Sequence, residues 1–271
     1  MADVAALLAA YDDQVRPSEA RNLPAGAYAE ADGPIVRVVG LYQGFVSAPA
    51  ELTLGGHELD ALIARQREFF AGRGEAVEWK TRAHDRPEDL PVRLRAAGFV
   101  PEPTETVLIG LAGPQAERQA PSPPGVSIRL TDAPEDMRRV AAMESEVYQE
   151  DWGWMADELI GRVQTGQFAV FVAEAEGQVV SSAWLVFKPG TQFAGLWGGA
   201  TRPAWRGRGI YRALVGRRAQ FAAARDVRFL QVDASDDSRP ILERLGFVAI
   251  TTTTPYVWTP GQRSETGHSP R

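Results

Sequence analysis

The 271-residue chain contains no cysteine and only three histidines, which lie far apart in the sequence: His57, His84 and His268. The absence of cysteine excludes thiol nucleophiles, disulfides and thiolate metal sites. Because each histidine stands in a different local context, the sequence favours neither a metal site nor a Ser-His-Asp triad. We therefore expect no metal and interpret the histidines as surface or structural residues.

Long apolar runs and an excess of basic residues are also lacking. No apolar run approaches the roughly 20 residues that a membrane span requires, and Met1–Tyr11 lacks the basic region of a secretory signal. The formal net charge is -6, whereas nucleic-acid binders usually present a basic face. The sequence predicts a soluble, cytoplasmic protein without nucleic-acid or membrane partners.

The composition is that of a globular protein, with 44% hydrophobic residues, and the length suggests about two domains. Four prolines mark the segment 112–125 as a linker, because proline lacks an amide donor and fixes its backbone torsion. The polar residues 260–271 read as a disordered tail. We expect two domains, 1–111 and 126–259, joined by that linker.

Elements of both types alternate after the linker, which indicates an α+β fold. A strand precedes a helix that Asp132 is expected to cap, and an apolar hairpin turns at residues 176–178. Further expected elements are a strand at 193–201, a helix to about Arg225, a strand at 227–233, a short helix at 238–245 and a last strand near 255–258.

The first half of the chain repeats the end of the second half. Residues 94–100 match 242–248, including the Gly98-Phe99 and Gly246-Phe247 pairs. Further upstream, residues 54–69 align with 206–221. Such internal similarity predicts two domains of the same fold in tandem.

The segment Arg206-Gly207-Arg208-Gly209-Ile210-Tyr211 joins the strand that ends at Thr201 to a helix. The first amides of a helix lack intrahelical partners and carry partial positive charge, and glycine allows a phosphate to approach. The segment therefore predicts an anion cradle, with a simple surface turn as the alternative. It lacks the Gly-Lys-Ser/Thr ending of a P-loop and the third glycine of a dinucleotide fingerprint.

Apolar side chains give this helix a buried face, at Ile210, Leu214 and Phe221. Its arginines are expected on the outer, solvent side, at Arg212, Arg217 and Arg218.

Residues 201–214 resemble the acetyl-CoA loop of the GNAT N-acetyltransferases, in which Arg/Gln-x-x-Gly-x-Gly/Ala follows a strand and a proline. Arg206 and Gly209 match, whereas Tyr211 stands where that family has glycine or alanine. The resemblance covers residues 126–258 and implies two tandem GNAT-like domains, each a mixed, mostly antiparallel sheet flanked by helices. It implies acetyl-CoA as co-substrate, bound by Ala200, Thr201, Arg206, Gly207, Arg208, Gly209, Ile210 and Tyr211.

The first half has Leu54 and His57 where Arg206 and Gly209 stand in the second. The resemblance therefore implies a degenerate first domain that does not bind CoA. Its role is open to two interpretations: recognition of the acceptor, or dimerisation of the chain as a homodimer.

The resemblance implies direct attack of a small-molecule amine on the thioester, with backbone donors around residues 199–201 for the oxyanion. Glu146 is our candidate base, with Glu144, Glu150 and Asp151 as alternatives, and Asp233, Asp236 and Asp237 as candidates further along the chain. Leu242 stands where the family often has the tyrosine acid, so Ser238 and Tyr211 are the candidate acids and Tyr256 a weaker one. The missing tyrosine also leaves a second function open, a non-catalytic acyl-CoA-binding regulatory module.

Four tryptophans are expected to cluster around this predicted site: Trp152, Trp154, Trp197 and Trp205. They are interpreted either as core residues or as the wall of a pocket for an apolar or cationic amine.

Overall fold

A computed structural model describes residues 3–21, 23, 26–118 and 121–261. The chain forms two compact units. Unit 1 comprises the described residues up to Val107 together with those from Ile250 onward, and unit 2 comprises Leu108–Ala249. Most of the expected tail, residues 262–271, lies outside the described part.

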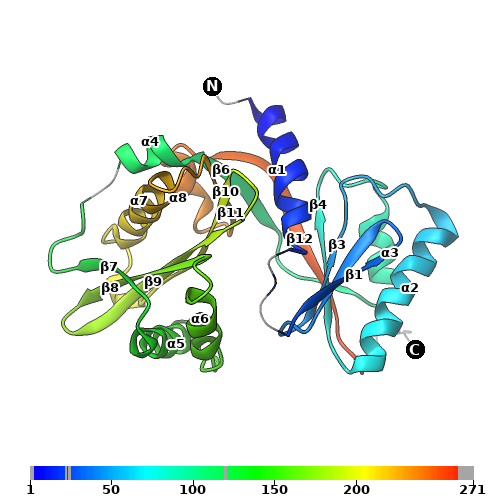
Figure 1. Cartoon of the computed structure of the whole chain (residues 1–271), viewed down its shortest axis with the longest axis horizontal. Helices are drawn as coiled ribbons and strands as arrows, with labels where there is room; N and C mark the ends of the chain where they lie inside the picture. The colour runs from blue at the N-terminus through cyan, green and yellow to red at the C-terminus, as the bar shows by residue number, and fades with distance from the viewer. Residues whose placement is uncertain (1–2, 22, 24–25, 119–120, 262–271) are drawn as a thin grey trace, which may run out of the picture. The chain divides into compact units, whose positions relative to one another are not determined.

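Unit 1 is built around a mixed sheet in the order β1-β2-β3-β4-β12, with β5 paired to β12 (Figure 1). Its strands are β1 (Tyr28–Asp32), β2 (Ile35–Val39), β3 (Gly44–Ser47), β4 (Val77–Arg82), β5 (Val100–Pro101) and the part of β12 (Val248–Trp258) from Ile250 on. Only the β3–β4 pair is parallel among them. The helices are α1 (Val4–Ser18), α2 (Gly56–Arg73) and α3 (Leu90–Ala96), and the core includes Leu62, Phe70 and Trp79.

Unit 2 repeats this plan in the order β7-β8-β9-β10-β11-β6. Its strands are β7 (Ser127–Thr131), β8 (Phe168–Ala175), β9 (Gln178–Phe187), β10 (Phe193–Thr201), β11 (Phe229–Ala234) and the part of β6 (Glu105–Leu111) from Leu108 on. The β10–β11 pair is parallel, and the β7–β8, β8–β9 and β9–β10 pairs are antiparallel. The expected mixed, mostly antiparallel sheet is confirmed.

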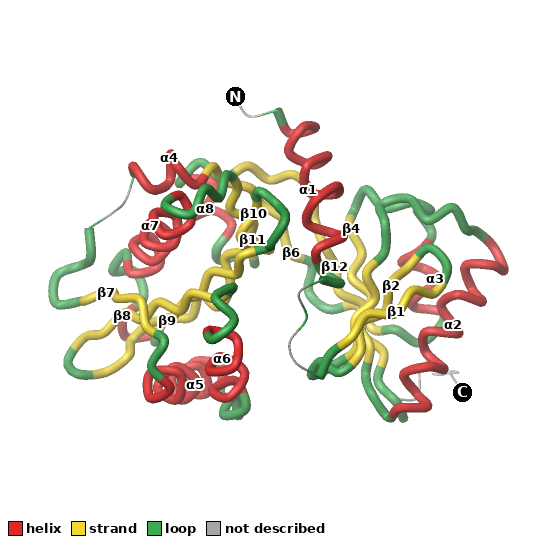
Figure 2. Tube along the Cα trace, viewed as in Figure 1, coloured by secondary structure: helices red, strands yellow, loops and turns green. Residues whose placement is uncertain are grey.

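Helices cover both faces of the unit 2 sheet (Figures 1 and 2). On one face lie α5 (Pro134–Tyr148) and α6 (Met155–Val163), which share a core with Val170 and Ala200. On the other face lie α4 (Ala112–Glu117), α7 (Ile210–Ala223) and α8 (Arg239–Arg244), which share a core with Leu185 and Leu196.

The expected hairpin is the β8–β9 pair, and its turn has positive φ at Glu176 and Gly177, as two-residue hairpin turns require. The cap expected at Asp132 is wrong. The N-cap of α5 is Ala133, and the Thr131 hydroxyl accepts the Ala133 amide at 3.2 Å. Thr131 thus satisfies an amide at the helix entrance.

The linker expectation is wrong for the first half of residues 112–125, because α4 begins at Ala112. Pro114 falls in the first turn of α4, where an amide has no intrahelical acceptor, so its missing donor costs little. Ala112 is fully buried and belongs to the core beneath α7. Hydrophobic contact therefore extends regular structure into a segment that its prolines marked as irregular.

The expected domain boundaries 1–111 and 126–259 differ from the two units, because each half gives its last strand to the other. Residues 108–111 of β6 lie in unit 2, where the Ala112 amide donates to the Arg228 carbonyl at 3.0 Å. β12 pairs instead with β4 of unit 1, from Thr253–Arg82 to Trp258–Val77. The repeat hides this exchange, because two halves with the same local pattern offer equivalent places for the final strand.

Candidate active site

The two parallel strands of unit 2, β10 and β11, are paired at their beginnings and then separate. β10 and β11 pair only from Phe193–Phe229 to Gly195–Gln231. β10 then continues to Thr201 along β9 alone, and β11 continues to Ala234. One edge of β10 is thereby left facing the space between the strands, where an extended ligand can lie against its backbone.

A β-bulge lies at this opening. Trp197 pairs with Trp184 and Ala200 with Ser182, so Gly198 and Gly199 together oppose one residue of β9. A bulge leaves its extra residue outside the ladder and re-aims the backbone. The amides of the bulge are therefore suitable donors for an oxygen placed beside β10.

The bulge is tightly held from both faces of the sheet. A Cβ on Gly199 would lie 2.7 Å from the ring of Tyr211, and one on Gly198 would overlap the indole of Trp184. The two glycines thus allow Tyr211 of α7 and Trp184 of β9 to press against the strand.

The loop between β10 and α7 has the form expected of an anion cradle. Gly207 and Gly209 have φ of 75° and 84°, and a Cβ on either would meet nothing within 4 Å, so the loop surface is open. The first intrahelical bond runs from Ala213 to Gly209 at 3.1 Å. The amides of Ile210 and Tyr211 therefore precede the helical ladder, where a pyrophosphate accepts hydrogen bonds well.

Two arginines add charge to the loop. Arg206 donates through Nε to the Thr201 carbonyl at 3.0 Å, which anchors it to the end of β10. The Arg208 guanidinium lies 4.4 Å from the centroid of the Trp205 ring. These contacts orient both side chains. Because neither partner is an anion, the contacts do not neutralise the two positive charges.

Glu144 is a buried carboxylate on the opposite face of the sheet. It extends from α5, is 1% exposed, and accepts a 2.7 Å hydrogen bond from the Ser182 hydroxyl of β9. Burial raises the pKa of Glu144 to about 7, and the Ser182 hydrogen bond opposes this rise only in part. A carboxylate with this pKa can accept a proton near neutral pH.

Tyr148 stands one helical turn after Glu144 in α5. Partial burial of the phenol and the nearby Glu144 charge raise the pKa of Tyr148, and Arg206 opposes this rise. Tyr148 therefore lies within the electrostatic reach of both a candidate base and the phosphate-binding loop. α5, β9 and the β10–α7 loop thus converge on one region.

The other sequence candidates lie in different surroundings. Glu146 is exposed and ion-paired with Arg202, whose Nε also donates to the Val179 carbonyl at 2.9 Å. Ser238 is the N-cap of α8, and its hydroxyl donates to the Ser235 carbonyl at 3.2 Å. The phenol of Tyr211 contacts the bulge, and burial raises its pKa against the opposing charge of Arg218.

Arg218 is the residue whose place the sequence did not reveal. Expected on the outer side of α7, it is buried, with Nη1 3.2 Å from the carbonyls of both Trp184 and Trp197. Burial lowers its pKa to about 10. The spacing offered a signal, because Arg218 stands one turn after Leu214 and shares its face.

The equivalent opening in unit 1 is closed. After β3 and β4 pair in parallel, the chain pairs again at Glu51–Arg86, with the Leu52 amide 2.9 Å from the Arg86 carbonyl. Arg16 of α1 also donates to the Ala48 carbonyl and forms an ion pair with Asp85. In unit 1, strand pairing and a buried arginine thus fill the space that corresponds to the opening between β10 and β11 in unit 2.

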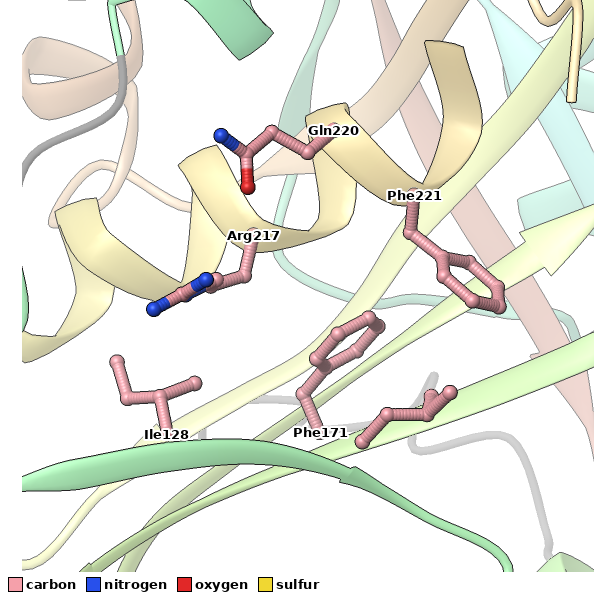
Figure 3. A pocket seen from close by; sticks show the side chains of 6 residues that line it. Ile128, Phe171, Arg217, Gln220 and Phe221 are labelled. Carbon is pink, nitrogen blue, oxygen red and sulfur yellow. The ribbon is translucent and has the colours of Figure 1, made fainter. Parts of the chain in front are cut away.

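A separate apolar groove borders the far half of α7 (Figure 3). Its lining residues come from β7, β8 and α7: Ile128, Leu130, Phe171, Arg217, Gln220 and Phe221. Arg217 lies about 10 Å along the helix from Ile210 by the 1.5 Å rise per residue. The groove therefore contains none of the predicted site residues.

Residues 131–247 match the Acetyltransferase (GNAT) family. This segment of unit 2 is therefore a GNAT acetyltransferase domain, and the coarse activity that this family supports is acetyl transfer.

Solved structures resemble the chain over most of its length. A GCN5-related N-acetyltransferase from Kribbella flavida has 15% identity and a TM-score of 0.68, covering 96% of this chain and 95% of that chain. One from Sphaerobacter thermophilus has 16% identity and a TM-score of 0.61, covering 96% and 93%. A tandem GNAT protein from the clavulanic acid biosynthesis pathway has 15% identity and a TM-score of 0.64, covering 91% and 87%. The tandem GNAT fold is confirmed.

No curated protein matches the chain in sequence. In the described part, no helix has both the length and the apolar character needed to cross a bilayer.

Proposed function

We propose that unit 2 binds acetyl-CoA and transfers its acetyl group to the amine of a small molecule by direct attack on the thioester. The observation that carries the proposal is the placement of Glu144, a buried carboxylate whose pKa is about 7. The charges of both Glu144 and Arg206, which belongs to the glycine-containing loop, act on the phenol of Tyr148. In this proposal the base and the anion cradle act on one ligand, bound where β10 and β11 separate.

The loop and the strand end supply the binding contacts. The amides at the start of α7, with Arg206 and Arg208, hold the pyrophosphate. The end of β10, including Ala200 and Thr201, runs beside the pantetheine arm. The bulge amides donate to the thioester oxygen, where negative charge develops during attack.

Glu144 accepts a proton from the acceptor ammonium, which frees the nitrogen lone pair to form the new C–N bond. As the C–S bond breaks, Tyr211 donates its phenolic proton to the departing thiolate. The acylated nitrogen loses its second proton to water, Tyr211 regains a proton from solvent, and Glu144 releases its own proton to solvent, so that one proton is released for each acetyl group transferred. In this proposal Glu144 takes the base role for which the sequence favoured Glu146. Glu146 and Ser238 act in local structure, through Arg202 and Ser235.

The binding step is tested by titrating acetyl-CoA into the protein and its Gly209→Val variant, using calorimetry. Valine at a φ of 84° is strained and narrows the cradle, so the affinity is expected to fall about tenfold or more. Gly161→Ala in α6, where a Cβ meets nothing within 4 Å, is the matched control. Absence of binding by the unaltered protein at millimolar acetyl-CoA would refute the proposal.

Release of free thiol, measured against a panel of amines, tests the catalytic step. Amine-dependent thiol release supports acetyl transfer. Tight binding without turnover for any amine would instead favour a non-catalytic acyl-CoA-binding module.

A further inference from the structure

Three aromatic rings, called the aromatic stack below, lie one against the next where α5 is followed by α6. The ring centroids of Tyr148 and Trp152 are 5.4 Å apart with the rings tilted by 42°, and those of Trp152 and Trp154 are 5.5 Å apart in a stacked arrangement. Tyr148 is 51% exposed and Trp154 is 44% exposed. Ring surface that ordinarily adds to a core is therefore presented to solvent.

This stack begins beside the proposed base. Tyr148 stands one helical turn after Glu144 in α5, and Glu144 accepts a hydrogen bond from Ser182 on β9. The stack therefore extends outward from the position where the acceptor nitrogen must lie.

A second pair of indoles lies on the same face of the sheet. Trp184 packs against the core beneath α5 and α6, and Trp197 pairs directly across from it on β10, so the two side chains share a face. The Trp184 ring occupies the space beside Gly198 in the bulge, and Trp197 remains 44% exposed. Aromatic surface thus reaches from the acetyl position to the solvent.

The carboxylates near the stack are poorly suited to hold several cationic groups. Glu144 is buried and reserved for proton transfer, and Glu146 is neutralised by Arg202. Asp151 accepts the Gly153 amide at 2.9 Å, whereas Glu150 is exposed. A polycationic acceptor would need more uncompensated negative charge at the wall itself.

The Nε1 atom of Trp152 is buried without a hydrogen-bond partner. A buried indole N–H is usually satisfied. This donor, in the middle of the stack, adds one polar contact point to an otherwise apolar wall.

Resting on the proposed function, we propose that the acceptor is a primary amine joined to an aromatic ring by a short apolar chain. The ring lies against Trp154 and Trp197, and the chain directs the nitrogen to Glu144. Each favourable aromatic pair strengthens binding about twofold to tenfold beyond the area it buries.

Initial rates with acetyl-CoA and four amines test this class: phenethylamine, 2-cyclohexylethylamine, hexylamine and spermidine. Phenethylamine is expected to show a kcat/KM about tenfold or more above the others, because two ring contacts add to its binding. Trp154→Ala and Trp197→Ala should lower the ratio of the phenethylamine kcat/KM to the hexylamine kcat/KM to about one, and Trp154→Phe should restore part of that ratio. Tyr42→Ala, at an exposed aromatic of unit 1, is the matched control.

Two failures are distinguishable in this design. Equal rates for phenethylamine, 2-cyclohexylethylamine and hexylamine would overturn the aromatic acceptor while leaving acetyl transfer intact. If no amine is acetylated, ¹⁹F spectra of protein labelled with 5-fluorotryptophan decide the matter. Phenethylamine at about 10 mM, ample for millimolar affinity, must shift the Trp154 signal, and an unmoved signal would overturn the inference.

Discussion

Glu144 is the residue on which the proposed chemistry depends most. Its pKa of about 7 results from burial that one hydroxyl offsets only in part. Because only the ionised carboxylate accepts a proton, kcat/KM should rise with pH until about 7 and then level. Glu144→Gln keeps an acceptor for Ser182 but cannot accept the proton, so kcat should fall about 10²- to 10⁴-fold. A pH profile of both proteins measures this, and an unchanged profile in the variant would exclude Glu144 as the base.

Glu144→Gln should lower activity but raise the stability of the folded protein above neutral pH. The pKa of Glu144 rises from 4.5 to about 7 on folding, so the folded state binds more protons between these values. Stability from this group is therefore full below pH 4.5 and is lost as pH rises through 7. At pH 8, Glu144→Gln should be more stable than the unaltered protein by about 3 kcal/mol. Urea unfolding at pH 4.5 and 8 measures the difference, which should nearly vanish at the lower pH.

Arg218 supports the bulge from behind. Its Nη1 donates to the carbonyls of Trp184 and Trp197, which form the last β9–β10 residue pair before the bulge interrupts the ladder. Arg218→Met would leave both carbonyls without this donor and allow the strand to shift, so kcat should fall about tenfold while the KM for acetyl-CoA changes little. Arg218→Lys should recover part of kcat. A loss confined to KM would argue against a role in positioning the bulge.

At the scale of the element, the β10 bulge and the start of α7 depend on each other. The Tyr211 ring packs directly against Gly199, and a Cβ added to Gly199 would lie only 2.7 Å from that ring. Gly199→Ala should therefore lower the thermal midpoint by several degrees, corresponding to about 1–3 kcal/mol of overpacking. Without the Tyr211 ring the added methyl group has space, so Gly199→Ala should lower the midpoint less in the Tyr211→Ala protein than in the unaltered protein. Scanning calorimetry of the four proteins measures the coupling, and additive effects would contradict this contact.

At the scale of the whole molecule, the exchanged strands decide which fragments fold. Residues 108–249 contain β6 from Leu108 on, α4 and the complete unit 2 core. A fragment 108–249 should unfold cooperatively and bind acetyl-CoA, whereas a fragment 126–259 lacks Leu108 and Ala112 and carries β12 without its β4 partner. The second fragment should be less stable by several kcal/mol, since each large buried side chain contributes about 1.5–3 kcal/mol. Equal unfolding midpoints would contradict the exchange.

The sequence by itself determined the tandem fold, the β8–β9 hairpin and the loop before α7. These depend on local patterns, namely alternation, glycine at a turn, and a strand followed by glycines and an amphipathic helix. Such patterns are set by residues close together in the chain. The resemblance at Arg206 and Gly209 then predicted which ligand the loop binds. The similarity of residues 54–69 to 206–221 predicted a second domain of the same fold.

Only the tertiary structure decided the acid–base group, the buried Arg218 and the exchange of β6 and β12. Glu144 and Glu146 are two residues apart in one helix, yet one is buried against Ser182 and the other is paired with Arg202 at the surface. A pKa depends on the surrounding solvent and partners, which come from distant segments. The exchanged strands have the same cause, because strand pairing joins residues far apart in sequence.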